Sequence, residues 1–213
     1  MIAGTMSRAD LCADLLASLH DASEIFARGV DDMVPLLNTA AADFSRHRPL
    51  TKLGTLTAEV GRMVYPAPAD IYLFKSSLWG IAPVAKAKPW ERHWPGPMPD
   101  VRQVYGASGY ELHLTPAPTQ LQLMSLGSEF RYYYFATHTI GTDAADTTLS
   151  QGDRFLLLLR AQAEAMRELT MRNVKKPVQM RDGLHSSPRN MTPAALHAEL
   201  MKEWEMKVAR LGI

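Results

Sequence analysis

The spacing of apolar residues changes twice along this sequence, and that change limits the folds open to it. Near the start, Leu11, Leu15 and Leu19 recur at helical spacing, which predicts an amphipathic helix over residues 8–20. In the middle, apolar and polar residues alternate as in half-buried strands, and in the last third the helical spacing returns. Helical ends around a β-rich middle predict an α+β fold.

The helical ends contain four expected helices. Ser7 followed by Asp10 resembles a capping box before the first helix. A second helix is predicted to begin near Asp31 or Asp32 and to end before Pro49, so that the first two form a helical hairpin. A third begins at Asp153. Its predicted apolar stripe is Phe155, Leu158, Leu159, Gln162, Met166 and Leu169. Charged residues largely off that stripe are Arg160, Glu164, Arg167 and Glu168.

The last helix is expected to be capped by Thr192, with Pro193 at its first position. Its predicted apolar side carries Leu196, Leu200, Trp204, Val208 and Leu211.

The middle third predicts strands and turns. Residues 55–60 and 63–65 flank Gly61, which predicts a short hairpin. Five prolines between Pro83 and Pro99 forbid regular ladders and predict a long structured loop. The sequence GASG at residues 106–109 predicts a tight turn.

Three consecutive strands are expected after that turn. Tyr110, Leu112 and Leu114 share one face of the first strand, and Leu121 and Leu123 alternate with polar neighbours in the second. The third covers residues 129–138, so the three strands would form an antiparallel meander.

Composition excludes some functional classes. The 213 residues include 23 basic and 22 acidic side chains, for a net charge of +1, so the whole chain neither attracts nor repels nucleic acid strongly. The longest aliphatic or aromatic run, residues 155–159, is far shorter than the roughly 20 residues that span a bilayer. The first residues lack a secretory pattern, and the one cysteine, Cys12, is expected to be a core residue of a protein made in a reducing cytoplasm.

The sequence lacks the familiar motifs for metal and nucleotide chemistry. It contains no HExxH, no paired CxxC, no GxxxxGK[ST] and no GxGxxG. We therefore expect no catalytic, metal-binding or cofactor-binding residues and no enzyme activity. The enzymatic alternative is an acid-base pair that uses His113 or His138 with a carboxylate such as Glu111, in a small cytosolic enzyme. Structural histidines held by hydrogen bonds are the simpler interpretation.

The aromatic run FRYYYFATH at residues 130–138 places rings on both faces of one strand. Phe130, Tyr132 and Tyr134 take one side, and Tyr133 and Phe135 take the other. Each ring covers about 150–250 Å², so both faces require burial. Either the terminal helices cover the strand on both sides, or one face contacts another subunit. Stacking of single-stranded bases is a third and weaker interpretation.

Charge is distributed unevenly along the chain. Residues 1–50 carry 4 basic and 7 acidic groups, whereas residues 151–213 carry 11 basic and 7 acidic groups. The basic excess lies mostly in Arg172, Lys175, Lys176, Arg181 and Arg189. The segment 172–189 is therefore an alternative nucleic-acid contact, and opposite charges at the two ends of the chain would also allow pairing between subunits.

Several segments also resemble a known family through the order in which they appear. They are PLLNTAAADFSRHRPL (35–50), LTAEVGRMVYPAPADI (56–71), YELHLTPAPTQ (110–120), YYYFATHTI (132–140), TTLSQGDRFLLLLRAQAEAMRELTMRN (147–173) and PVQMRDGLHSSPRNMTPAALHAEL (177–200). Together with the acidic start of the second helix, they resemble head-tail connector (adaptor, neck) proteins of tailed bacteriophages over roughly residues 31–205.

The resemblance implies a structural part of a virion. Such a protein forms a ring of about twelve copies below the portal protein and continues the channel through which double-stranded DNA passes without sequence recognition. It contacts sister subunits and a downstream neck or tail component, and it involves no membrane. The expected location is the neck of the virion, after synthesis in the host cytoplasm.

The same resemblance implies that the chain is divided into a body and a C-terminal arm. Residues 1–173 would be the body, with helices at 8–48 and 153–173 and a β-rich insertion at 55–140, and residues 174–213 would be an extended C-terminal arm with a helix. The implied portal-binding residues of the arm region are Arg172, Lys175, Lys176, Arg181, Arg189, Leu196 and Trp204. The implied subunit or neck interface is Tyr132, Tyr133, Tyr134 and Phe135.

Overall fold

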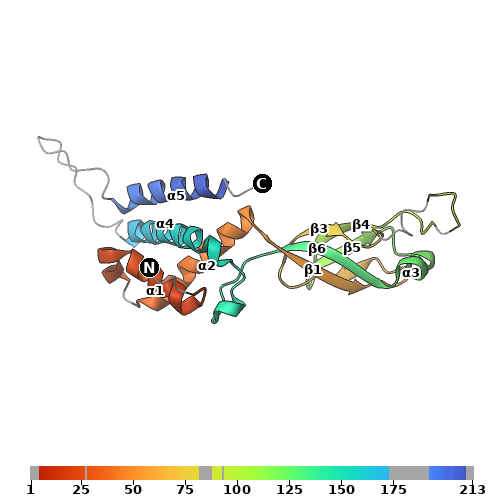
Figure 1. Ribbon diagram of the computed structural model, residues 1–213, viewed down its shortest axis with the longest axis horizontal. Helices are drawn as coiled ribbons and strands as arrows, with labels where there is room; N and C mark the ends of the chain where they lie inside the picture. Colours follow the sequence, from red (N-terminus) through yellow and green to blue (C-terminus); the bar gives the residue numbers. More distant parts are fainter. Residues whose placement is uncertain (1–4, 27, 82–87, 93, 173–191, 210–213) are drawn as a thin grey trace, which may run out of the picture. The chain divides into compact units, whose positions relative to one another are not determined.

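The chain folds into two compact units in this computed structural model, which describes residues 5–26, 28–81, 88–92, 94–172 and 192–209. Residues 1–48 and 138–213 form a helical unit, and residues 49–137 form a β unit (Figure 1). The predicted α+β class is confirmed. The predicted boundary between body and arm, at residues 173 and 174, lies outside the described residues, and the last helix belongs to the helical unit.

The helical unit contains four α-helices and three short 3₁₀ turns among its described residues. They are α1 (Arg8–Ser18), η1 (His20–Ile25), α2 (Val30–His47), η3 (Ala144–Asp146), η4 (Gln151–Asp153), α4 (Arg154–Arg172) and α5 (Pro193–Ala209). As predicted, Ser7 caps α1, because its hydroxyl accepts from the amide of Asp10 at 3.2 Å. The Asp10 carboxylate turns instead to the Thr5 amide at 3.0 Å, and hydrogen bonds from Thr5 lower the pKa of Asp10.

Helix α4 lies at the centre of this unit and packs against α1, α2 and α5 (Figure 1). Its core residues include Leu157 and Leu169, which α1 and α2 help to enclose. The predicted single stripe is wrong at three positions: Phe155 is exposed, whereas Arg160 and Glu164 are buried. A helix with neighbours on several sides buries more than one stripe, and these two charges are buried because they pair with each other and with α2.

The β unit consists of two three-stranded antiparallel sheets that share one core. The strands are β1 (Leu50–Thr57), β2 (Val64–Pro66), β3 (Ile71–Ser77), β4 (Asp100–Gly106), β5 (Gly109–Thr115) and β6 (Glu129–Ala136). The sheet orders are β1-β6-β3 and β2-β5-β4. Gln103 joins the sheets at their edges, because its side chain accepts from the Phe74 amide at 2.9 Å. Leu112 and Leu114 of one sheet and Phe130 and Tyr132 of the other belong to the same buried cluster.

Two predicted strand pairings are wrong. Residues 55–65 do not form a hairpin, because β1 pairs with β6 along its whole length and β2 pairs with β5 in the other sheet. Between them the chain turns at Gly61, where φ is +76°, and the Gly61 amide donates to the Pro118 carbonyl at 2.9 Å. Long-range pairing with β6 therefore replaces the local pairing that the sequence suggested.

The predicted meander is interrupted by a helix, α3 (Gln120–Leu126). Thr119 and Gln122 form a reciprocal capping box, and the buried Gln122 amide donates to the Pro97 carbonyl at 2.8 Å. A short alternation of apolar and polar residues does not distinguish two turns of helix from a strand. The turn at residues 106–109 is confirmed, since Gly106 and Gly109 close the β4-β5 hairpin. The described residues between 88 and 99 contain turns and bends and no strand, as expected for the proline-rich loop.

Candidate interaction surfaces

Strand β6 holds the aromatic run at the centre of its sheet, with one face directed into the core. Phe130, Tyr132 and Tyr134 are buried, and the ring of Tyr132 lies 6.3 Å from that of Phe130 and 5.9 Å from that of Tyr134. The opposing residue on β1 is Gly54, where an added Cβ would lie 2.5 Å from Cζ of Tyr132. A glycine at this position therefore makes room for the tyrosine ring.

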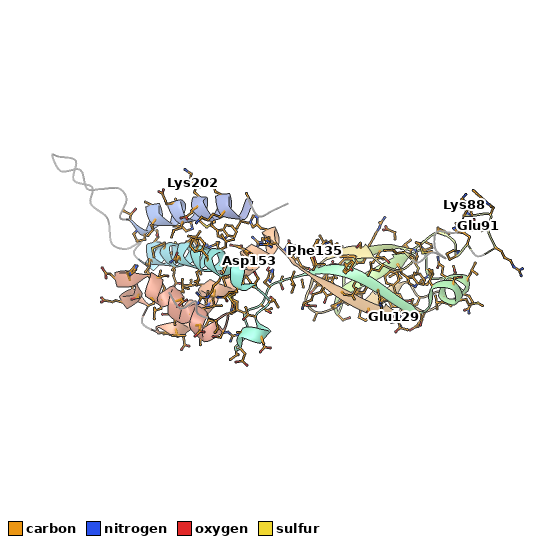
Figure 2. The ribbon with its side chains drawn as sticks, viewed as in Figure 1. Lys88, Glu91, Glu129, Phe135, Asp153 and Lys202 are labelled. Carbon is orange, nitrogen blue, oxygen red and sulfur yellow. The ribbon has the colours of Figure 1, made fainter. Side chains whose placement is uncertain are left out.

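The other face of β6 is directed outward and carries apolar side chains from all three strands. Tyr133 is 38% exposed and lies opposite Leu53, which is 54% exposed. Phe135 (Figure 2) lies opposite Leu73, which is 51% exposed. The Lys75 ammonium lies 4.9 Å from the Phe135 ring. We call Leu53, Leu73, Tyr133 and Phe135 the outer patch.

The outer patch corrects two expectations about the aromatic run. Tyr132 and Tyr134 are core residues, so of the four residues of the predicted interface only Tyr133 and Phe135 lie on the outer face. The inner face of β6 is covered by the second sheet of the β unit and not by the terminal helices.

A polar cluster lies at one margin of the β-unit core. The Tyr134 hydroxyl donates to Oδ1 of Asp70 at 3.1 Å, and Nζ of Lys52 donates to Oδ2 of Asp70 at 2.7 Å. Burial alone would raise the pKa of Asp70, but these two hydrogen bonds outweigh it and the pKa is lowered. Burial, and then the bond to Asp70, raises the pKa of Tyr134 to about 12. The tyrosine therefore remains a neutral donor, and the aspartate remains an acceptor, over a wide pH range.

In the helical unit, buried charges join α2 to α4 beneath α5. Nε of Arg160 donates to the Asp43 carboxylate at 2.9 Å, and Nη1 of Arg160 donates to Glu164 at 3.1 Å. Trp204 of α5 covers this cluster: its ring centroid lies 6.0 Å from the Arg160 guanidinium and 5.0 Å from the His47 ring. Trp204 is only 2% exposed, so the structure places this predicted portal-binding residue in the core of the helical unit and not at its surface. Its indole is used to hold α5 on the unit.

The other residues of the predicted portal-binding set fall into two groups. Arg172 has several partners in its own unit: it pairs with Glu168, donates to the Ile25 carbonyl at 3.1 Å, and lies 5.0 Å from the Phe26 ring. Leu196 is exposed and lines a groove of about 590 Å³ between η1, α4 and α5. Four members lie outside the described residues, namely Lys175, Lys176, Arg181 and Arg189.

The two candidate histidines lie in different units. His113 is partly exposed on β5, and its Nε2 lies 3.1 Å from the Glu111 carboxylate, so this expected pair is present. His138 has Nε2 2.9 Å from the Arg48 carbonyl, which can only accept, and Nδ1 3.1 Å from the Thr148 hydroxyl. His138 therefore ties the end of α2 to the segment that follows β6, in the manner of a structural histidine.

The thiol of Cys12, possible metal ligands and possible membrane-spanning helices were considered in turn among the described residues. Cys12 is fully buried in the helical core, and burial raises the pKa of its thiol. Within the described ranges, no three His, Cys, Asp or Glu side chains converge as metal ligands. None of the described helices is long and apolar enough to cross a bilayer.

Sequence patterns missed two features that shape these surfaces. The Asp43–Arg160–Glu164 cluster was not predicted, and its one signal is that Arg160 and Glu164 stand four residues apart in an alanine-rich helix. Leu53 and Leu73 were also missed, because their alignment with Tyr133 and Phe135 depends on long-range register. The sequence matches no protein-family model and no curated protein.

Proposed function

We propose that this chain is a structural head-tail connector of a tailed bacteriophage. Its work would be assembly and not catalysis. Copies of it would form a ring that joins the portal to the next neck or tail component and continues the channel for double-stranded DNA. The proposal rests on the order of sequence segments described above, and twelve copies is the number that the resemblance implies.

The observation that carries the proposal is the outer patch. Leu53, Leu73 and Tyr133 are exposed, and together with the half-buried Phe135 they form an apolar face across three strands. Contiguous apolar side chains at a surface mark contacts between proteins. A sister subunit or the next neck component would bury this face.

The portal contact is assigned to the basic residues Lys175, Lys176, Arg181 and Arg189. Since Trp204 holds α5 against the helical unit, removing residues 174–213 would damage the fold and would not test portal binding cleanly. Substituting the four basic residues with glutamine leaves α5 in place. A control variant replaces two exposed basic residues, Arg167 of α4 and Lys202 of α5, with glutamine. Figure 2 labels Lys202 on α5.

The test combines these variants with the portal protein of the same phage. We expect wild type and the Arg167/Lys202 control to form rings on portal particles in electron micrographs, and the variant lacking four basic residues to lose binding. The double variant Leu53→Asp/Leu73→Asp should bind the portal without completing the ring or neck. Its control is Met63→Asp/Val104→Asp, which changes exposed apolar residues of the other sheet region. Wild-type protein that never associates with portal would refute the connector assignment.

The same samples test the two alternatives. The Glu111–His113 pair is the one described arrangement that favours an enzyme, and turnover of a substrate that is abolished by His113→Ala would favour that function. A nucleic-acid module using residues 172–189 predicts DNA binding whose affinity falls steeply with salt.

A further inference from the structure

Strand β1 forms an open edge of the β unit. It lies on one side of its sheet, with β6 between it and β3 (Figure 1). The inward residues of β1 are half-buried, whereas those of β6 are fully buried. The outward residues of β1 are exposed, namely Thr51, Leu53, Thr55 and Thr57. The side of β1 that is turned away from β6 is therefore accessible to solvent.

The hydrogen-bond register shows which backbone groups lie at this edge. In an antiparallel pair, alternate residues bond to the partner strand, and the residues between them direct their N–H and C=O groups away. Ala58 donates to the Ser128 carbonyl at 2.7 Å and continues the β1–β6 register, so the even-numbered residues of β1 bond to β6. On β6, Arg131 accepts from Leu78 at 2.8 Å on the β3 side, which fits the same alternation. The odd-numbered residues of β1 therefore direct their backbone groups to the open edge, and no described residue outside the sheet hydrogen-bonds to them.

The other strand edges of the unit carry features that discourage pairing. β3 has two register irregularities, β2 is three residues long and ends in Pro66, and β4 carries the exposed charges Asp100 and Arg102. β1 instead pairs with β6 in unbroken register over eight residues without a proline, and its single charge, Lys52, is held by Asp70 at 2.7 Å. A regular edge without free charge is a template for another strand.

We propose that β1 pairs with β1 of a second copy of this chain, antiparallel and about a twofold axis at Gly54. In this register Thr51 lies opposite Thr57 of the second copy, and Leu53 lies opposite Thr55. These are the residues whose backbone groups are directed to the open edge, so each pair can exchange two hydrogen bonds. Cross-strand threonine pairs add to the stability of such a sheet. Two three-stranded sheets then become one sheet of six strands.

The sequence of β1 favours its own copy as the partner in this register. Lys52 lies opposite Leu56, so that like charges do not face each other, whereas an axis at Lys52 would place two lysines in opposition. Gly54 faces Gly54 at the axis, where the Cα atoms of a pair without hydrogen bonds approach to about 4.5 Å. Leu53 belongs to the outer patch, so the pairing also joins the outer patches of the two copies into one apolar face.

A contact about a twofold axis closes on itself and produces a dimer, unlike the contact that repeats around a ring. The inference therefore goes beyond the connector function: it concerns the free chain and requires neither the portal nor DNA. The pairing uses backbone groups at the edge and leaves the outer patch accessible. Failure of the dimer would leave the connector proposal standing.

The first experiment mixes two single variants of the full chain, Leu53→Cys and Thr55→Cys, under mild oxidation. We expect much more disulfide-linked dimer from the mixture than from either variant alone, because these residues face each other with Cα atoms about 5.5 Å apart. A chain that carries both changes should stop at a dimer. Cys12 is buried and does not compete.

The control for cross-linking mixes Leu73→Cys with Thr55→Cys. Leu73 is 51% exposed on the same outer face, but it lies on β3 at the other side of the sheet. No dimer from Leu53→Cys with Thr55→Cys, or as much dimer from the control or from one variant alone, would overturn the proposal.

The second experiment exchanges charges at the opposed pair and measures self-association by sedimentation. The variants Leu53→Lys/Thr55→Lys and Leu53→Glu/Thr55→Glu each place like charges opposite one another, so each should associate about tenfold more weakly than wild type. An equimolar mixture should recover dimers, because lysine then faces glutamate.

The control for the charge exchange is Leu121→Lys/Met124→Lys, which changes exposed residues of α3 and should leave the association unchanged. A mixture of the two charged variants that stays monomeric would contradict the pairing of β1. So would a wild-type chain that is monomeric at every concentration, including one whose β1 edge binds an extended segment of another protein.

Discussion

The two units use their aromatic and charged side chains in opposite ways. In the helical unit, Trp204 and the ion pairs of Arg160 are enclosed between α5, α4 and α2. In the β unit, apolar side chains remain exposed on the outer patch and at Tyr105 and Tyr110 beside the β4-β5 turn. The difference indicates that the helical unit uses this ring and these charges to hold its own helices together, whereas the β unit presents apolar side chains that another chain can bury.

The largest expected effect on stability tests the buried ion pairs of Arg160 in the helical unit. Arg160→Ala leaves the Asp43 and Glu164 carboxylates without their shared partner beneath Trp204, so we expect unfolding free energy to fall by about 3–5 kcal/mol. Urea unfolding followed by far-ultraviolet circular dichroism measures this. Arg167→Ala removes a mostly exposed partner of Glu164 and should cost less than about 1 kcal/mol. Equal losses of unfolding free energy in the two variants would mean that the buried ion pairs of Arg160 contribute no more to stability than an exposed pair.

A smaller effect is expected in the β unit at alkaline pH. The pKa of Tyr134 is raised from 10.0 to about 12, so the folded state holds this proton more tightly than the unfolded state between those values. The stabilisation is complete below pH 10 and is lost as pH rises through the folded pKa, with a total of about 2–3 kcal/mol. Urea unfolding across this pH window should show a flatter profile for Tyr134→Phe than for wild type. Parallel profiles would argue against the Tyr134–Asp70 bond.

The smallest expected effect tests how closely the β-unit core is packed. Gly54→Ala places a methyl group against the Tyr132 ring and should cost about 1–2 kcal/mol. In a Tyr132→Leu background the same change should cost less, because the ring is gone, and a double-mutant cycle of unfolding free energies measures the difference. Thr55→Ala, an outward-facing change on the same strand, is the control. Identical costs in the two backgrounds would show that the ring does not set the requirement for glycine.

Local patterns predicted several parts of this fold correctly. Ser7 caps α1, residues 106–109 close a hairpin, and the two faces of β6 alternate as the aromatic run indicated. Each of these depends on neighbours within a few residues, where capping chemistry and the two-residue period of a strand act directly.

Other parts depended on residues far away in the sequence. Residues 55–65 form no hairpin because β1 pairs with β6 over eight residues. Helix α3 forms because Thr119 and Gln122 cap its start and the Pro97 carbonyl accepts a hydrogen bond from the buried side-chain amide of Gln122. The candidate surfaces follow the same rule: Tyr132 and Tyr134 became core residues when the second sheet covered them, while Tyr133 stayed outside.

The sequence by itself determined the fold class, the helical character of the two ends and the two alternating faces of β6, because these follow from hydrophobic period and local hydrogen bonding. Tertiary structure alone decided which face is buried. Trp204 and Arg160 lie inside, and Leu53 and Trp90 lie outside, because burial depends on which distant segment arrives to cover a face, and no local pattern contains that partner.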